Sequence, residues 1–522
     1  MAFNVFQKVF SKKLSKNMFN MSYNHKTTFN MGELIPTALW ECMPGDKWKM
    51  SSESMIRFLP LVAPVYHRIE LKTCFYFVPN RLLWSEWEDW ITENSAVAAP
   101  SIQNLDTINE GSIMDYLGFP TTWNNSGFDA SPMALAAYLL IYDEYWRDQN
   151  LVTEKFVPLV NGNNSNYESL MIEVPRRAAW IHDYFTSCLP TAQKGAAVTL
   201  PLLNDDTVDV EYKSGTGLAA LLRKVSDDSL ATTVEGLAKN VNAEIDSTID
   251  GSLYIDPNST LEADINAEAA TINSLRNAFA VQRYLERLMR TGSKYIEFLR
   301  SFFGTSPIDA RLQRPEYIGQ TKSVVSISEV LSATETLNSS DVIVNPVGQY
   351  AGHGISVSGG NSHMYSVKEH GFIMGITTVR PMTSYQQGLN KMHTRINDPV
   401  DYPNPEFQHL GEQEVKSYEL YADSVATNNL NSVFGYQQTY AEMRSMPGQT
   451  SGEMQSTLDF FHLNRQFATK PELNQTFIEC NPRNDIFADT APETDKLIGH
   501  FYNKASVIRS LSAIGEPGLP VM

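Results

Sequence analysis

Residues 67–77, HRIELKTCFYF, and residues 370–381, HGFIMGITTVRP, decide the fold class of this chain. At every second position from Ile69 to Phe77 the first segment has an apolar residue or Thr, and charged residues separate them in its first half. Because successive side chains of a strand point to opposite faces, this pattern predicts a half-buried strand that ends near Pro79. The more continuous apolar run of the second segment predicts a more deeply buried strand.

Further strand and helix patterns are scattered over the whole chain. Helices are predicted at Trp84–Ile91 and at Pro132–Arg147, where Ser131 is a suitable N-cap and Pro132 suits the first helical position. Shorter strand patterns follow at Val324–Ser328, Leu458–Leu463 and Phe501–Ser510. Strands spread along the sequence, with insertions between them, favour an antiparallel sandwich over alternating βα units. We therefore expect a mainly β fold.

Composition places the chain among globular proteins that fold in a reducing compartment. It has 522 residues, 42% of them hydrophobic, and four cysteines without C-x-x-C spacing. The longest apolar stretch, Met133–Tyr142, is about half of the roughly 20 residues that a membrane span needs. The N-terminus lacks the pattern of a secretory signal. We expect a protein that does not enter a membrane.

Charge is unevenly distributed in this acidic chain, whose formal net charge is −18. Residues 1–32 have five lysines and no acid, whereas residues 196–270 have fourteen Asp or Glu against four Lys or Arg. Nucleic-acid phosphates need cations, so any DNA contact must be local or assisted by a separate basic protein. The 196–270 segment also lacks Phe and Trp, which predicts a solvent-facing insertion with small helices at Leu218–Val225 and Val234–Ile245.

Residues 271–320, TINSLRNAFAVQRYLERLMRTGSKYIEFLRSFFGTSPIDARLQRPEYIGQ, predict a basic helix pair followed by an extended arm. Apolar residues from Leu275 to Leu288 have helical spacing, and Tyr295–Phe303 resumes the pattern after an interruption. Ser306-Pro307 then stops the helix, and a run with Arg311, Arg314 and Tyr317 follows. The stretch has no catalytic spacing, so we expect an element that packs against neighbours.

This stretch resembles a block of the major capsid protein of the Microviridae, and most closely its gokushovirus-like branch. The resemblance recurs in collinear order, and it is weak in the first 24 residues, in 196–270 and in the C-terminal tail. The matching segments are HKTTFNMGELIPTALWECMPGD (25–46), FYFVPNRLLWSEWEDW (75–90), YDEYWRDQNL (142–151), HDYFTSCLPTAQKG (182–195), EHGFIMGITTVRP (369–381), SYQQGLNKM (384–392), HLGEQEV (409–415), VFGYQQTYAEMRSMPGQTSGEM (433–454) and LNQTFIECNP (473–482).

The resemblance implies an eight-stranded antiparallel viral jelly roll with long, partly helical insertions. It divides the chain into a basic N-terminal arm (1–24), a first jelly-roll part (25–195), a variable surface insertion (196–270) and the rest of the jelly roll (271–522). The insertion would project near three-fold axes, where it could meet a host receptor. The function it implies is a T=1 icosahedral shell around a single-stranded DNA genome, assembled in the bacterial cytoplasm. Scaffolding, DNA pilot and small basic DNA-binding proteins would be partners.

The sequence contains no motif that supports catalytic chemistry. Walker, G-x-S-x-G, H-E-x-x-H and EF-hand patterns are missing, and we predict no catalytic residue, metal or cofactor. Glu86, Glu88 and Asp89 suggest the carboxylate pair of a glycoside hydrolase, but they alternate with tryptophans and fit the wet face of a helix. A sandwich enzyme acting on glycans remains the alternative function.

Two groups of residues are candidate subunit contacts. Trp84, Trp87 and Trp90 are spaced to form one aromatic stripe on a helix. Packing in the subunit core is one interpretation; an interface anchor is the other, because Trp, Tyr and Arg concentrate at buried contact centres. The same comparison applies to Arg311, Arg314 and Tyr317, where we favour an intersubunit role.

The N-terminal arm has three interpretations. Phe3, Phe6, Phe10 and Leu14 have near-helical spacing, which would suit a helix on a membrane surface. A tail without function is the second. The third is an inward-facing arm that touches DNA phosphates without sequence preference. The capsid resemblance favours the third, with contacts from Lys8, Lys12, Lys13 and Lys16.

Overall fold

A computed structural model describes most of the chain and separates it into two compact units. The larger unit is Met1–Ala192 with Leu288–Met522, and the smaller is Gln193–Arg287. The described residues are 16–92, 96–102, 108–122, 129–195, 210–212, 222–224, 253–255, 261–263, 272–290, 313–331, 336–337, 343–345, 350–396, 399–423 and 429–513.

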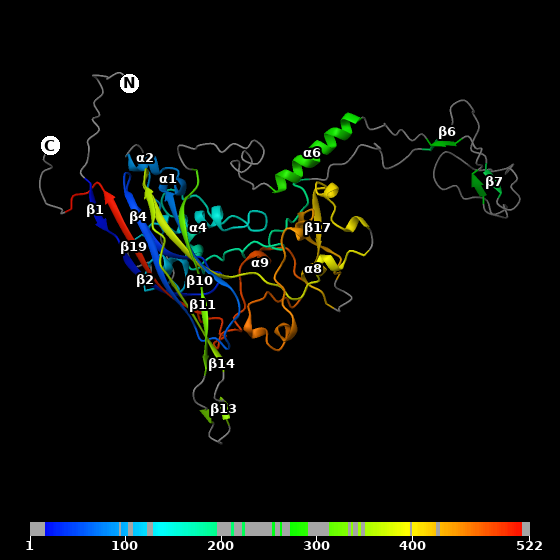
Figure 1. Ribbon diagram of the computed structural model, residues 1–522. Coiled ribbons are helices and arrows are strands. Elements are labelled where there is room, and N and C mark those ends of the chain that lie inside the picture. Colours follow the sequence, from blue (N-terminus) through cyan, green and yellow to red (C-terminus); the bar gives the residue numbers. More distant parts are fainter. Residues whose placement is uncertain are drawn as a thin grey trace, which may run out of the picture. The chain divides into compact units, whose positions relative to one another are not determined.

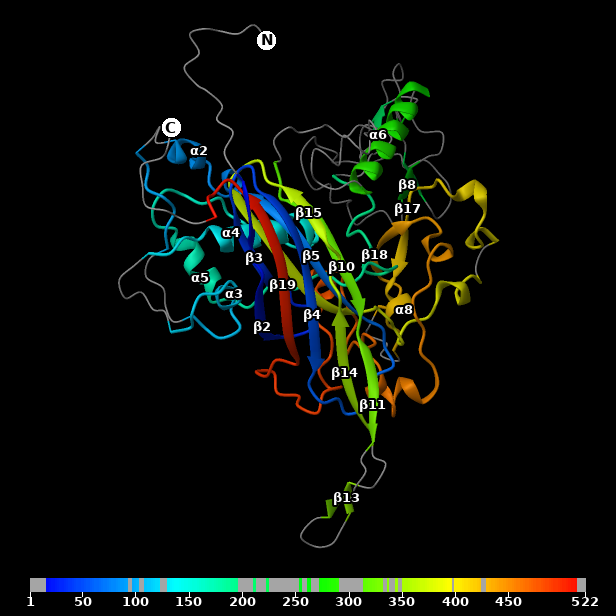
Figure 2. The same cartoon turned by 60° about the vertical axis from the view of Figure 1, so that its left-hand side comes forward.

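The larger unit is built on two antiparallel sheets that face each other (Figures 1 and 2). The first has seven described strands in the order β1-β19-β4-β14-β11, with β2 also beside β19 and β15 also beside β4. Its longest pairing joins β19 to β4, from Leu497 opposite Phe58 to Ile508 opposite Lys47. The strands are β1 Asn17–Asn20, β2 Tyr23–Phe29, β4 Lys47–Phe58, β11 Ser326–Leu331, β14 Tyr350–Ser358, β15 His363–Ser366 and β19 Leu497–Arg509.

The second sheet has four described strands in the order β10-β5-β16-β3. Its two central strands pair from Gly371 opposite Pro79 to Pro381 opposite Ile69. Both strands were predicted from the sequence, and both are confirmed. The strands are β3 Ile35–Cys42, β5 Ile69–Pro79, β10 Glu316–Val324 and β16 Gly371–Pro381.

The expectation that β5 is half-buried is wrong, because its second face is covered as well. Phe75 and Phe77 face the seven-stranded sheet in one core cluster with Trp48. On the opposite face, Tyr76 and Val78 pack in another core cluster against helix α4 (Met133–Tyr145). The larger unit is therefore a sandwich of two sheets with a helical layer behind the four-stranded one, and the most apolar strands lie in the middle.

The helix predicted at 132–147 is confirmed as α4, and the Ser131 hydroxyl accepts a bond of 3.4 Å from the Met133 N–H. The helix predicted at 84–91 is only partly confirmed. Trp84 has an extended backbone after α1, and the helix itself begins at Trp87. The short helices around this layer are α1 Asn80–Leu83, α2 Trp87–Ile91, α3 Ile113–Tyr116 and α5 Glu168–Met171.

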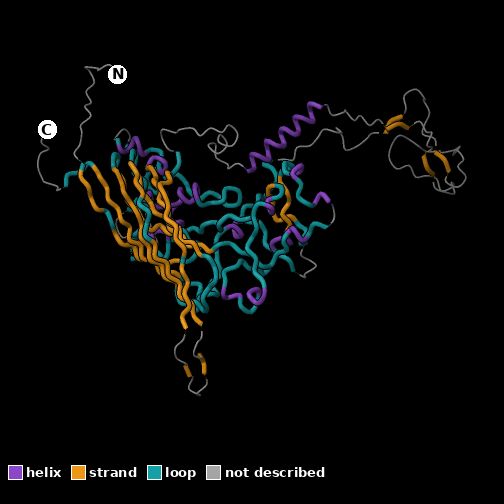
Figure 3. The backbone as a smooth tube through the Cα atoms, in the orientation of Figure 1, coloured by secondary structure: helices purple, strands orange, loops and turns teal. Residues whose placement is uncertain are grey.

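Loops dominate the rest of the larger unit, which Figure 3 shows in teal beside the orange sheets. They surround a separate small core that includes Phe185, Tyr385 and Phe477. The strand predicted at Leu458–Leu463 is wrong, since this segment contains a short 3-10 helix. The regular elements of this loop region are β17 Glu412–Lys416, α8 Ser417–Leu420, β18 Val433–Gln438 and α9 Gln475–Ile478.

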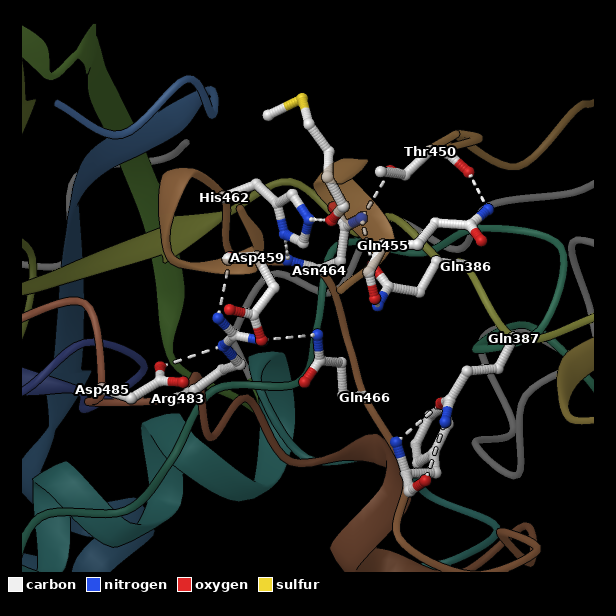
Figure 4. A network of polar contacts seen from close by, with 12 residues as sticks. Gln386, Gln387, Thr450, Gln455, Asp459, His462, Asn464, Gln466, Arg483 and Asp485 are labelled. Atoms are coloured by element: carbon white, nitrogen blue, oxygen red, sulfur yellow. Dashed lines mark hydrogen bonds and ion pairs between the residues drawn. The ribbon is translucent and has the colours of Figure 1, made fainter. Parts of the chain in front are cut away.

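Side-chain amides replace regular backbone pairing in this loop region (Figure 4). The Gln387 side chain donates to the Phe467 carbonyl at 2.9 Å and accepts from the Phe467 N–H at 2.7 Å. Asn464 donates to the Gln386 side chain at 3.0 Å and to the Thr450 hydroxyl at 2.5 Å. The Gln387 bonds satisfy both backbone polar groups of Phe467, and the Asn464 bonds tie three loop segments together through their side chains.

The described part of the smaller unit consists of short elements and most of one helix. The helix predicted from Leu275 to Leu288 is confirmed as α6 (Ile272–Arg290), which ends just inside the larger unit. The helix predicted at 218–225 is wrong at residues 222–224, which form a strand. The helices predicted at 234–245 and 295–303 lie outside the described residues. The strands are β6 Val210–Tyr212, β7 Leu222–Lys224, β8 Leu253–Ile255 and β9 Leu261–Ala263.

Candidate subunit-contact and nucleic-acid surfaces

The three tryptophans do not form one helical stripe. The Trp84 side chain is 1% exposed, and its indole N–H donates to the Asn161 side chain at 2.7 Å. Trp87 is half-buried against the same core, and Trp90 is 37% exposed. Their rings still touch, with centroids 5.9 Å apart for Trp84 and Trp90 and 5.6 Å apart for Trp87 and Trp90. Trp84 is thus a core residue of its own subunit, and Trp90 has the surface that a neighbour could contact.

The extended arm after α6 is only partly described. Arg311 lies outside the described residues, and Arg314 is half-buried. Tyr317 on β10 is 42% exposed, and its ring meets the edge of Tyr76 at a centroid distance of 5.7 Å. The Tyr145 hydroxyl donates to the Pro315 carbonyl at 2.5 Å. The arm is therefore anchored on the helical layer with Tyr317 facing outward, and its intersubunit role stays a prediction.

A larger group of exposed apolar side chains lies on the loop region, and we call it the loop surface. Two of its members, Ile396 and Leu410, are 83% and 70% exposed. Large apolar side chains exposed on ordered loops are typical of surfaces that contact other proteins. The loop surface consists of Leu389, Met392, Ile396, Tyr402, Leu410, Met443 and Met446.

Polar bonds hold the two segments of the loop surface together. The Arg395 guanidinium donates to the Glu442 carboxylate at 2.9 Å, and both side chains are about nine-tenths buried. Gln413 donates to the other oxygen of Glu442 at 2.6 Å. The Asn404 N–H donates to the hydroxyl of Tyr440, whose own backbone is left-handed with φ 61°. Because these loops are already ordered, association would cost little further entropy.

The small core under the loop surface contains its own buried polar pairs. The Tyr385 hydroxyl donates to the Asp183 carboxylate at 2.7 Å, and burial raises the pKa of Tyr385 well above its ordinary value. The Arg465 guanidinium lies 4.0 Å from the centre of the Phe477 ring. Beside it an open hollow of about 630 Å³ is lined by loop residues 463–483 and Trp180. These groups are bonded to one another, which makes them structural.

A second surface is the exposed side of the seven-stranded sheet, which we call the sheet face. On β4, Lys47, Lys49 and Arg57 point outward while Trp48 and Ile56 between them are buried. These cations were not predicted as a site from the sequence. The signal was present in residues 47–58, KWKMSSESMIRF, whose alternation of apolar and polar residues marks a strand with one wet face.

The N-terminal lysines are described only in part. Lys16 is exposed and its ammonium donates to the Gly45 carbonyl at 2.9 Å, next to the edge strand β1. Lys8, Lys12 and Lys13 lie outside the described residues. In the described part of the chain, no group of three or more His, Cys, Asp or Glu is placed to hold a metal ion. No described helix is long and apolar enough to cross a membrane.

An antiparallel sandwich is one of the architectures of viral shell subunits, and exposed apolar side chains on ordered loops suit contacts between copies. The chain belongs to the family described as capsid protein (F protein), whose model matches residues 7–519. It is 34% identical to capsid protein VP1 of Bdellovibrio phage phiMH2K, over 98% of this chain and 97% of the relative. It is 32% identical to capsid protein VP1 of Chlamydia phage 1, over 99% and 98%, and 29% identical to capsid protein VP1 of Spiroplasma virus 4, over 88% and 87%.

These matches confirm the expected family and the major capsid function. The chain is a structural component of the virion, not an enzyme, and the glycan hydrolase alternative is not supported. The mainly β, antiparallel architecture is confirmed as well. The expected count of eight strands is not confirmed, since the described residues place seven strands in one sheet and four in the other.

Proposed function

We propose that this chain is the repeating subunit of a T=1 icosahedral shell that encloses a single-stranded DNA genome. Its membership of the capsid family supports the shell, and the loop surface is the observation that carries the contacts. Closure of a shell buries such apolar surface on every copy, whereas a single subunit leaves it in water.

The proposal includes further partners. Scaffolding, DNA pilot and small basic DNA-binding proteins would assist assembly in the bacterial cytoplasm, and the 196–270 insertion would contact a host receptor. Lys8, Lys12, Lys13 and Lys16 would touch the packaged DNA. Trp84, Trp87, Trp90, Arg311, Arg314 and Tyr317 were predicted as contacts between subunits; of these, exposure favours Trp90 and Tyr317.

Variants of the loop surface test the proposal. Leu410→Asp and Met443→Asp place a charge where neighbouring subunits would pack, so we expect a folded subunit that no longer forms shells when co-expressed with scaffolding protein. Val174→Asp is the matched control, because Val174 is 68% exposed and lies off the loop surface. Assembly is measured by sedimentation and negative-stain imaging, and folding by thermal unfolding.

The wild-type chain must form closed spherical particles, or rings that close when scaffolding protein is added. If it stays monomeric at every concentration with scaffold present, the shell proposal fails. If Leu410→Asp and Met443→Asp assemble as well as Val174→Asp does, the loop surface is not the contact.

A further inference from the structure

The sheet face is basic although the chain is strongly acidic. The outward residues of β1, β2, β4, β14, β15 and β19 contain a single acid, Glu53, and it pairs with Lys504. Asp495, at the rim, accepts a bond of 2.6 Å from the Thr28 hydroxyl. Against a total charge of −18, the cations of this face stand out. They are Lys26, Lys47, Lys49, Arg57 and Lys504.

Strand register fixes the position of each of these cations on the sheet, since Lys47 pairs with Ile508, Lys49 with Ser506 and Arg57 with Ile498. Lys26 on β2 and Met55 on β4 flank His500 on β19 from its two sides. On β4, Lys47 and Lys49 are two residues apart, so their Cα atoms are separated by about 7 Å along the strand. The rigid pairing of three strands therefore fixes where the charges lie, whereas lysines on a loose tail would first have to be ordered.

Aromatic and apolar side chains share this face with the cations. The Tyr502 ring is half-buried on β19, and the Lys504 ammonium lies 5.5 Å from its centre. Met364 and Val357 are 76% and 73% exposed on the neighbouring strands. Cations that neutralise a backbone, together with a ring on which bases stack, are what proteins use to hold single strands. A partner that offered only phosphates would not need the Tyr502 ring. A protein partner would not require a face on which, in the described part of the chain, only Lys504 of the five cations is paired with an acid.

We propose that the sheet face binds single-stranded DNA, with Lys47, Lys49 and Arg57 on the phosphates and Tyr502 stacked on a base. This inference rests on the proposed function in that the strand would be the packaged genome, and it turns the sheet face toward the interior of the shell. The edge strand β1, which directly follows Lys16, belongs to the same sheet. Lys16, whose ammonium donates to the Gly45 carbonyl, therefore lies where the chain enters this sheet.

The test measures the binding of fluorescent oligodeoxythymidylate to the purified full-length subunit as a function of salt. For single strands, log K falls by about 0.7 per decade of salt for each phosphate contact. The double variant K47Q/K49Q removes two contacts and should therefore reduce the slope by about 1.4. If variant and wild type bind equally at 1 M salt, this difference makes the variant's binding roughly 25-fold weaker than that of the wild type at 0.1 M salt. The control R444Q/K470Q removes two cations from the loop region and should keep the wild-type slope.

Tyr502 is tested separately because stacking does not release counterions. Tyr502→Ala should weaken binding by about fivefold or more at an unchanged salt slope, and Tyr502→Phe should restore it. Thermal unfolding must show that every variant is folded. If the wild-type subunit does not bind the oligonucleotide, or if K47Q/K49Q and R444Q/K470Q have the same slope, the inference is wrong.

Shell formation by the same variants separates this inference from the proposed function. K47Q/K49Q should still form shells with scaffolding protein, because its changes lie away from the loop surface. If it binds DNA normally but forms no shells, the sheet face is a contact between subunits and the inference is overturned. If the wild type forms no shells while the salt slopes differ as expected, the DNA site stands and the shell proposal fails.

Discussion

Trp84 and Trp90 provide the sharpest separation of core packing from subunit contact. Trp84 is buried in its own subunit, so Trp84→Ala should destabilise folding itself. An aromatic side chain of this size buries on the order of 250 Å². At about 25 cal/mol per Å², full transfer to water gives an upper bound of about 6 kcal/mol. Because the surroundings relax in part, measured costs of such truncations are about 3–5 kcal/mol, and we expect that range.

Trp90→Ala is the matched variant, because Trp90 touches Trp84 and Trp87 but keeps 37% of its surface in water. We expect a loss of about 1–2 kcal/mol in the free energy of unfolding, together with impaired shell assembly. Urea unfolding of the unassembled subunit, followed by far-UV circular dichroism, measures the first quantity, and sedimentation measures the second. A cost below about 1 kcal/mol for Trp84→Ala would refute the core assignment. Normal assembly of the Trp90 variant would refute the contact.

Two further substitutions test the close approach of Gly32 to the Cys480 carbonyl and the buried imidazole of His67. Gly32 has φ +84°, and an added Cβ would overlap the Cys480 carbonyl, so Gly32→Ala should cost more than about 2 kcal/mol in urea unfolding. Gly118→Ala, at φ +95° with nothing within 4 Å of the added Cβ, should cost only about 1 kcal/mol; equal costs would exclude the overlap. Burial and nearby His462 hold the pKa of His67 below its ordinary 6.5, while its Nε2–H donates to the Met382 carbonyl at 2.6 Å. Below about pH 6.5 the His67 side chain therefore binds a proton more readily in the unfolded chain than in the folded one. The stability that the neutral, buried His67 contributes is complete above about pH 6.5 and is lost as the pH falls through the lowered pKa. A thermal unfolding series should show a flatter acid limb for His67→Gln, and an unchanged limb would contradict the assignment.

The strands in the middle of the sandwich were predictable because the pattern of apolar residues in their sequences indicates that they are buried. Residues 370–381 are apolar almost throughout, and β16 is buried on both faces. The alternation of apolar and charged residues in 67–77 predicted the strand correctly. It did not predict that the second face of this strand is covered by another element. That cover is α4, which reaches β5 and β16 only through the tertiary fold. A period of two predicts which residues share a face, whereas the layers on either side depend on distant segments.

The loop region was beyond sequence reasoning for a related reason. Its segments are held by amide and carboxylate bonds between residues far apart in the sequence, such as Gln387 with Phe467, eighty positions away, and Tyr385 with Asp183, 202 positions away. No period marks such contacts, and Leu458–Leu463 has a strand-like composition although it contains a 3-10 helix. The prediction that the three tryptophans form one helical stripe was wrong for the same reason, because a contact with a distant segment decides where Trp84 lies. Trp84 leaves the helix so that its indole can reach Asn161.

The two sheets have different roles: the four-stranded sheet contributes mainly to the core, and the seven-stranded sheet also has an exposed face that other molecules can contact. In the four-stranded sheet, β5 and β16 are covered on both faces, so a charge placed there would be buried at high cost. The seven-stranded sheet needs only its inner face for the core, which leaves every second residue of β4 and β19 free to vary. Selection on the outward residues can therefore adjust charge without disturbing the fold. The total charge of this chain is acidic and would argue against DNA binding. The sheet face shows that cations can still be concentrated locally, on the side of the seven-stranded sheet that does not form the core.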